Sequence, residues 1–154
     1  MRVFLFTVVT AVASATLPVR AQDRLPWYNV PVQQGPAGAY TCVTRPTGDM
    51  RLAVIVCDTY KMSMMPPEAQ AFLMAHEHGH VFQFVNGLNF APNPEADADC
   101  YAAIYLAQNN PQVLEAAIAW FERVLGPRGG DVTHGNGLQI AQLARQCAAR
   151  VSAV

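Results

Sequence analysis

The pentapeptide HEHGH at positions 76–80 holds the side chains of this sequence that are best suited to chemistry. It lies within an apolar segment at positions 69–85 that we expect to be helical. Residues four apart share one face of a helix, so His76 and His80 can direct their imidazoles to a single point. This arrangement is typical of a zinc site, and Glu77 between them is placed to act as a base.

A tetrahedral catalytic zinc takes three protein ligands and keeps its fourth position for water. Asn93 and Pro94 have the pattern of a helix start, and Glu95 and Asp99 then share one face of that helix. We therefore expect Glu95 to bind the metal and Asp99 to accept the outer N–H of a ligating histidine. Glu95 also has an explanation without a metal, because the helix dipole favours acidic residues in the first turn of a helix. That effect does not explain Asp99.

These residues predict one Zn²⁺ per chain. His78 lies about 200° around the helix from His76. We expect it to be a surface or hydrogen-bonded residue and not a ligand.

Together, the two motifs resemble the gluzincin metallopeptidases. The resemblance is to the branch that contains the heat-shock membrane peptidases, the CAAX-prenyl proteases and their small soluble relatives, in which HExxH precedes E-x-x-A-D-x-x-A on a later helix. It covers roughly positions 66–102. It implies a zinc metalloendopeptidase acting on peptides or proteins, with an edge strand before the active helix, here positions 51–58, to hold extended substrate. The implied site residues are the ligands His76, His80 and Glu95, the catalytic base Glu77 and the outer partner Asp99.

A weaker part of the resemblance is Thr133-His134, which precedes the last expected helix. The family often has Thr-His-Pro-Pro there, with an arginine inside the helix. This chain has Gly135, Asn136 and Gln139 at those positions. Two roles for His134 therefore stand side by side: a catalytic one, stabilising an oxyanion, and a structural one, capping or packing the loop.

The N-terminus, positions 1–21, has the pattern of a secretory signal peptide. Arg2 precedes an apolar run at positions 3–17, and small residues end at Ala21, where we expect cleavage; Ala15 offers a second cut. The run is shorter than the roughly 20 apolar residues of a membrane-spanning helix, which argues against an uncleaved anchor. The remaining chain, 22–154, is then a single domain in the periplasm or outside the cell.

The net charge of the chain argues against nucleic acid and anionic lipid as partners. Without Arg2 and Arg20 the chain has 8 basic and 11 acidic residues, a formal charge of −3. No basic cluster is present to bind nucleic acid or anionic lipid.

The exported part contains four cysteines, an even count that favours two disulfides in an oxidising compartment. Three pairings are possible. We favour Cys42–Cys57, which would close a hairpin, and Cys100–Cys147, which would join the Glu95 helix to the last helix. A cysteine zinc site is disfavoured because no C-x-x-C spacing occurs.

The expected fold is α+β: a β-hairpin or small sheet packed on a bundle of about four helices, in a minimal zincin-like arrangement with two disulfides. An extended lead-in at positions 22–38 precedes it, with Trp27 and Tyr28 packed on the body. The expected strands are 39–45 and 51–58, and the expected helices are 66–86, 94–108, 111–125 and 138–151.

Two other functions remain open on the sequence. The same ligands would serve an exported zinc protein that uses the metal only to order its fold. The same chemistry would serve an amidase acting on cell-wall peptides. Substrate specificity and oligomeric state do not follow from the sequence.

Overall fold

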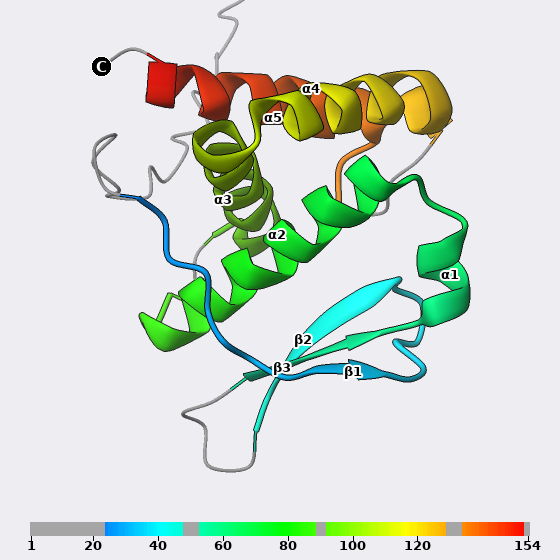
Figure 1. Cartoon of the computed structure of the whole chain (residues 1–154), viewed down its shortest axis with the longest axis vertical. Helices are drawn as coiled ribbons and strands as arrows, with labels where there is room; N and C mark the ends of the chain where they lie inside the picture. Colours follow the sequence, from blue (N-terminus) through cyan, green and yellow to red (C-terminus); the bar gives the residue numbers. More distant parts are fainter. Residues whose placement is uncertain (1–23, 48–52, 89–91, 129–133, 153–154) are drawn as a thin grey trace, which may run out of the picture.

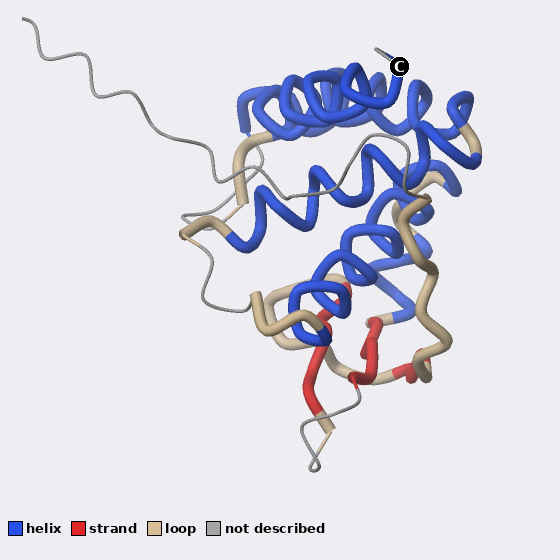
Figure 2. Tube along the Cα trace, turned by 90° about the vertical axis from the view of Figure 1, so that its left-hand side faces the viewer, coloured by secondary structure: helices blue, strands red, loops and turns tan. Residues whose placement is uncertain are grey.

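The chain is α+β, with a small sheet at one end and helices stacked against it (Figures 1 and 2). The computed structural model describes residues 24–47, 53–88, 92–128 and 134–152. The expected signal peptide and Thr133 lie outside the described residues. The expected fold class is confirmed, and the sheet has one strand more than the expected hairpin.

The helices begin where proline and asparagine predict. Pro67, Pro94 and Pro111 each stand first in a helix, where the missing N–H has no partner to lose. The Asn93 and Asn110 side chains accept backbone N–H groups and cap two of these helices. The helices are α1 (Thr59–Ser63), α2 (Pro67–Val85), α3 (Pro94–Asn109), α4 (Pro111–Trp120) and α5 (Gly137–Ser152), and a π-helical turn (Phe121–Leu125) and a 3-10 turn (Gly126–Arg128) follow α4. The short α1 was not expected from the sequence.

The sheet has the order β1-β3-β2. Its strands are β1 (Val32–Gln34), β2 (Cys42–Pro46) and β3 (Ala53–Cys57). The expected hairpin is present, because β2 and β3 pair antiparallel. The expectation that the second hairpin strand is the edge strand is wrong. The lead-in contributes β1, which pairs parallel with β3 on its other side and leaves β2 at the edge next to α2 (Figure 1).

The register shows which backbone groups of β2 point to the open edge. Asp58 N–H donates to the Thr41 carbonyl at 2.9 Å, so Thr41 and Asp58 form a hydrogen-bonded pair. Hydrogen-bonded and non-hydrogen-bonded pairs alternate along an antiparallel ladder. Cys42 and Thr44 are therefore non-hydrogen-bonded positions, and their N–H and C=O groups point away from β3.

Helix α2 lies between the sheet on one side and α3 and α4 on the other (Figure 1). One side of it packs Val81 against a cluster that includes Ile55 of β3. The other side packs Phe72 and Ala75 into the larger core of α3, α4 and α5. Because both sides are covered, the apolar residues of α2 are spread around the helix and are not confined to one face.

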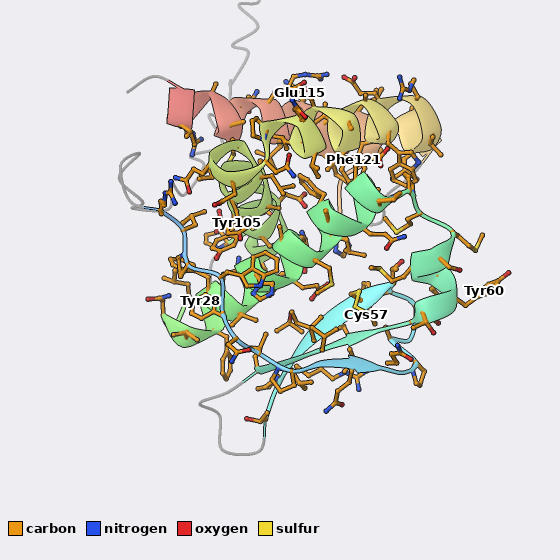
Figure 3. The ribbon with its side chains drawn as sticks, viewed as in Figure 1. Tyr28, Cys57, Tyr60, Tyr105, Glu115 and Phe121 are labelled. Carbon is orange, nitrogen blue, oxygen red and sulfur yellow. A yellow bond between two sulfur atoms is a disulfide. The ribbon has the colours of Figure 1, made fainter. Side chains whose placement is uncertain are left out.

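Two disulfides join separate elements of the fold, across 15 and 47 residues of sequence. Cys42–Cys57 links β2 to β3 at directly opposed positions, and Cys100–Cys147 links α3 to α5. Both favoured pairings are confirmed, and the sheet cysteine Cys57 lies below α2 in Figure 3. In the described part of the chain, none of the helices is long and apolar enough to cross a membrane.

The segment before β1 crosses α3 and α2 on its way to the sheet. Leu25 is buried in the helical core, and its N–H donates to Gln108 Oε1 at 3.2 Å. The Tyr101 hydroxyl donates to the Pro26 carbonyl. Trp27 stacks on His78, with ring centroids 3.6 Å apart. The expectation that Trp27 packs on the body holds, although it is still 48% exposed.

Candidate metal centre

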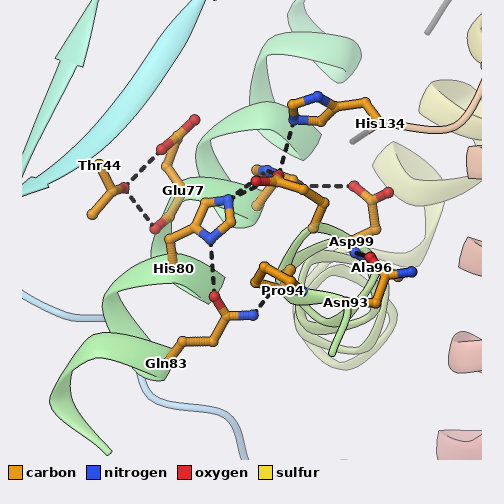
Figure 4. Close-up of polar contacts among 11 residues, drawn as sticks. Thr44, Glu77, His80, Gln83, Asn93, Pro94, Ala96, Asp99 and His134 are labelled. Carbon is orange, nitrogen blue, oxygen red and sulfur yellow. Dashed lines mark hydrogen bonds and ion pairs between the residues drawn. The ribbon is translucent and has the colours of Figure 1, made fainter. Parts of the chain in front are cut away.

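The site forms where α2 crosses α3 at very short range. A Cβ on Gly79 would lie 2.8 Å from the Cα of Ala98, so only glycine allows this approach. The histidines one turn apart on α2 then face the acids one turn apart on α3; His80 and Asp99 are labelled in Figure 4. The four expected residues that the crossing brings together are His76, His80, Glu95 and Asp99.

His76 is held from behind by Asp99. The Nδ1 of His76 donates to Asp99 Oδ1 at 2.8 Å, and both side chains are buried. Its other nitrogen, Nε2, faces the carboxylate of Glu95 at 3.2 Å. Asp99 thus occupies the outer position expected from the sequence, behind the imidazole and away from the point of convergence.

His76, His80 and Glu95 present one atom each to a common point. His80 Nε2 lies 3.0 Å from His76 Nε2 and 3.1 Å from Glu95 Oε2. With the 3.2 Å contact between His76 and Glu95, these atoms form a nearly equilateral triangle. Ligand atoms that bind one tetrahedral zinc ion at about 2.0–2.1 Å lie about 3.3 Å from one another. The triangle therefore has a size at which one metal ion could be held.

The chemistry of the three atoms also fits a cation. A neutral imidazole that donates through Nδ1 keeps a lone pair on Nε2, and a carboxylate oxygen is an acceptor only. Three acceptors at this separation repel one another unless a proton or a metal ion lies between them.

The pKa shifts of His76 and Glu95 are opposite in direction, and each favours the charged form of its residue. Burial alone would lower the pKa of His76, but hydrogen bonds to Asp99 and Glu95 outweigh it and raise the pKa to about 10. Burial alone would raise the pKa of Glu95, but hydrogen bonds from His134, His76 and His80 hold it far below its ordinary value. The surroundings thus favour a positive charge between the His76 imidazole and the Glu95 carboxylate. A proton supplies this charge when no metal is bound, and a metal ion would have to displace that proton to bind.

His134 enters the site from the loop before α5. Its Nε2 lies 2.9 Å from Glu95 Oε2, and its ring centroid lies 6.0 Å from that of His76. His76, Glu95 and His134 form a group that could hold a metal ion, since one ligand atom from each lies within 4.8 Å of the others. His80 Nε2 is also close to both His76 and Glu95, at 3.0 and 3.1 Å, which makes His80 a further candidate ligand.

Glu77 lies beside this cluster and is held from the sheet. The Thr44 hydroxyl of β2 lies 2.7 Å from Glu77 Oε2 and 3.1 Å from the Glu77 carbonyl (Figure 4). Glu77 is buried, yet it lines the same cavity as His76 and His80. Thr44, on the edge strand β2, therefore positions Glu77, the residue that the sequence predicts to act as the general base.

The cavity in front of these residues has a volume of about 540 Å³. The polar residues that line it include Glu77, His76, His80, Glu95 and His134. Its walls are largely apolar, with Tyr40, Val43 and Pro46 on the sheet side and Phe84 on α2. The size is in the range of small-molecule and peptide side-chain sites.

His78 differs from expectation. It is 2% exposed and lies under Trp27, and its Nδ1 has no hydrogen-bond partner among the described residues. Burial lowers its pKa to about 4. The prediction that His78 lies at the surface is wrong, and no hydrogen bond to Nδ1 is found among the described residues. The reason is that the lead-in segment, through Trp27, covers the face of α2 that carries His78.

Two polar residues of the site were missed in the sequence. Thr44 is 33 residues from Glu77 in the sequence, and no local pattern links them. Gln83 bonds to His80 Nδ1 at 2.9 Å and is 3% exposed. A polar residue one turn after His80 in an apolar helix was the available signal for Gln83.

Comparisons with known protein families, with curated proteins and with solved structures find no match to this chain. The assignment of a function therefore depends on the site itself.

Proposed function

We propose that this protein is an exported zinc-dependent metallopeptidase of gluzincin type. The observation that supports this most is the triangle formed by His76, His80 and Glu95, with Glu77 held beside it. Two imidazoles and one carboxylate are a common ligand set of catalytic zinc, with the fourth position left for water.

The chain's own residues would supply the rest of the reaction. Bound zinc would lower the pKa of water to about 7 and polarise the scissile carbonyl. Glu77 would accept a proton from the attacking water on its carboxylate and pass it to the leaving amine. Asp99 would hold the His76 ring in place throughout, and Thr44 would restrict the Glu77 carboxylate to one orientation.

An extended peptide fits the edge of the sheet. The backbone N–H and C=O of Thr44 point to the open side of β2, and Thr44 also contacts Glu77. A peptide that paired with β2 as an added strand would therefore pass close to the base. The apolar walls of the cavity, including Val43 and Phe84, would accept its side chains.

Export is supported by the two disulfides, which persist in oxidising compartments. The signal-peptide pattern of positions 1–21 agrees with them.

A second function, a zinc protein without catalysis, is favoured by one observation. His134 lies 2.9 Å from Glu95 Oε2, near enough that a small shift would make it a fourth ligand. Four protein ligands leave a tetrahedral zinc no position for water, which is the mark of a structural site.

The test combines metal analysis with cleavage of a peptide library by the mature protein. We expect one zinc per chain and hydrolysis that a chelator abolishes. Glu77→Gln should keep the zinc and lose hydrolysis by at least about 10²-fold, the contribution of a positioned base. Glu68→Gln is the matched control, since it removes an acid from the first turn of the same helix. A Glu77→Gln variant as active as wild type would refute the catalytic role.

A further inference from the structure

We propose that Gln83 is a positioning residue for His80, fixing the imidazole tautomer that leaves Nε2 free to bind a metal. This inference rests on the proposed function in one respect, since it takes His80 as a ligand. It concerns a residue that the gluzincin resemblance does not assign.

The orientation of the Gln83 amide is set by its second partner. Its Nε2 donates to the Pro94 carbonyl at 2.6 Å. A carbonyl accepts and never donates, so the amide nitrogen must face Pro94 and the amide oxygen must face the other way. That oxygen, Oε1, lies 2.9 Å from His80 Nδ1 (Figure 4).

The tautomer of His80 follows from this orientation. An amide oxygen only accepts, so His80 Nδ1 must carry the hydrogen. Neutral His80 then has its lone pair on Nε2, the atom that faces His76 and Glu95. Asp99 imposes the same tautomer on His76 through His76 Nδ1. The two histidines therefore have matched partners, a carboxylate for one and an amide for the other.

Gln83 also couples the two ligand helices. It is on α2, and Pro94 is the first residue of α3, directly before Glu95. One buried side chain thus contacts His80 and holds the start of the helix that supplies Glu95. Loss of both hydrogen bonds should affect the metal site more than it affects the rest of the fold.

The test compares Gln83→Met with Gln70→Met. Gln70 is also on α2, and its Nε2 donates to a backbone carbonyl, that of Met65, at 2.8 Å. Both variants lose an amide-to-carbonyl bond, but only Gln83→Met loses the acceptor of a histidine. Zinc affinity is measured by competition with a chelator. We expect a 10–100-fold loss for Gln83→Met, the range found when an outer partner of a metal ligand is removed, and no comparable loss for Gln70→Met.

A second variant separates the two bonds of Gln83. Gln83→Glu keeps an acceptor for His80 Nδ1 but cannot donate to Pro94. It should retain clearly more zinc affinity than Gln83→Met. Equal losses in the two variants would overturn the proposal, because the tie to Pro94 would then explain the effect.

The tautomer itself is read from imidazole ¹⁵N shifts in the folded wild-type protein without zinc. We expect the His80 proton on Nδ1 in wild type. A neutral His80 with its proton on Nε2 and none on Nδ1 would overturn the inference, whether or not the protein binds zinc. If wild type bound no zinc, the proposed function would fail separately, while the tautomer result would still decide the role of Gln83.

Discussion

Gly79 of α2 packs directly on the backbone of Ala98 of α3, with room for a hydrogen and no more. This contact sets the separation of the two helices at the level of the site. His76 and His80 lie on either side of Gly79 in the sequence, and Glu95 and Asp99 lie on either side of Ala98. The crossing point of the helices is thus also the centre of the candidate metal site.

Gly79→Ala should therefore separate the helices and weaken zinc binding. Alanine is the better helix former by about 1 kcal/mol. The steric conflict with backbone atoms of Ala98 outweighs this, because overpacking costs about 1–3 kcal/mol. We expect a net loss of stability in urea unfolding and a lower zinc affinity. A variant with wild-type zinc affinity and higher stability would show that the contact relaxes without disturbing the site.

Thr44→Val tests whether the edge strand positions the base. Valine has nearly the shape of threonine but has no hydroxyl for Glu77 Oε2. We expect kcat/KM on a peptide substrate to fall about 10-fold, within the total contribution of a general base, while zinc affinity stays unchanged. Thr44→Ser keeps the hydroxyl and is the control. Equal activity of the valine and serine variants would exclude this role for Thr44.

His134→Ala distinguishes the two proposed functions. If His134 acts on the substrate, its loss should reduce kcat by about 10²–10³-fold, as for removal of an oxyanion donor. Zinc affinity should then change little. A large loss of zinc affinity would instead identify His134 as a ligand and favour the structural zinc site. Chelator competition and steady-state kinetics on the same protein samples give both quantities.

Tyr101→Phe should change how stability depends on high pH. Burial raises the pKa of the Tyr101 hydroxyl above its usual value near 10, and the nearby hydroxyls of Tyr28 and Tyr105 add to the effect. The unfolded chain thus loses this proton at a lower pH than the folded chain does. The free energy of unfolding should therefore decline as pH rises above about 10.

The phenylalanine variant should lack this part of the decline. It should also be about 1 kcal/mol less stable at neutral pH, because the hydroxyl no longer donates to the Pro26 carbonyl. Urea unfolding at pH 8 to 11 measures both effects. Tyr60→Phe, at a residue that is 74% exposed and points away from α1 in Figure 3, is the control for neutral-pH stability. Parallel curves for wild type and Tyr101→Phe would contradict the prediction.

The sequence by itself determined the features that depend on local patterns. Spacing along one helix identified His76 and His80 as a pair, and the Asn93-Pro94 start predicted the helix that carries Glu95 and Asp99. The hairpin also followed, and of the three possible cysteine pairings the sequence favoured Cys42–Cys57 and Cys100–Cys147, which the structure has. Such features require only the periods of helices and strands and the conformations of proline and asparagine.

The tertiary structure decided everything that depends on contacts between distant segments. The lead-in adds β1 beside β3, and this moves the open edge of the sheet to β2. It also places Trp27 over His78 and so buries a histidine that the helix alone would expose. Thr44 meets Glu77 across 33 residues of sequence, and Gln83 meets Pro94 across 11. No periodicity encodes these contacts, because they arise only when packing brings separate elements together.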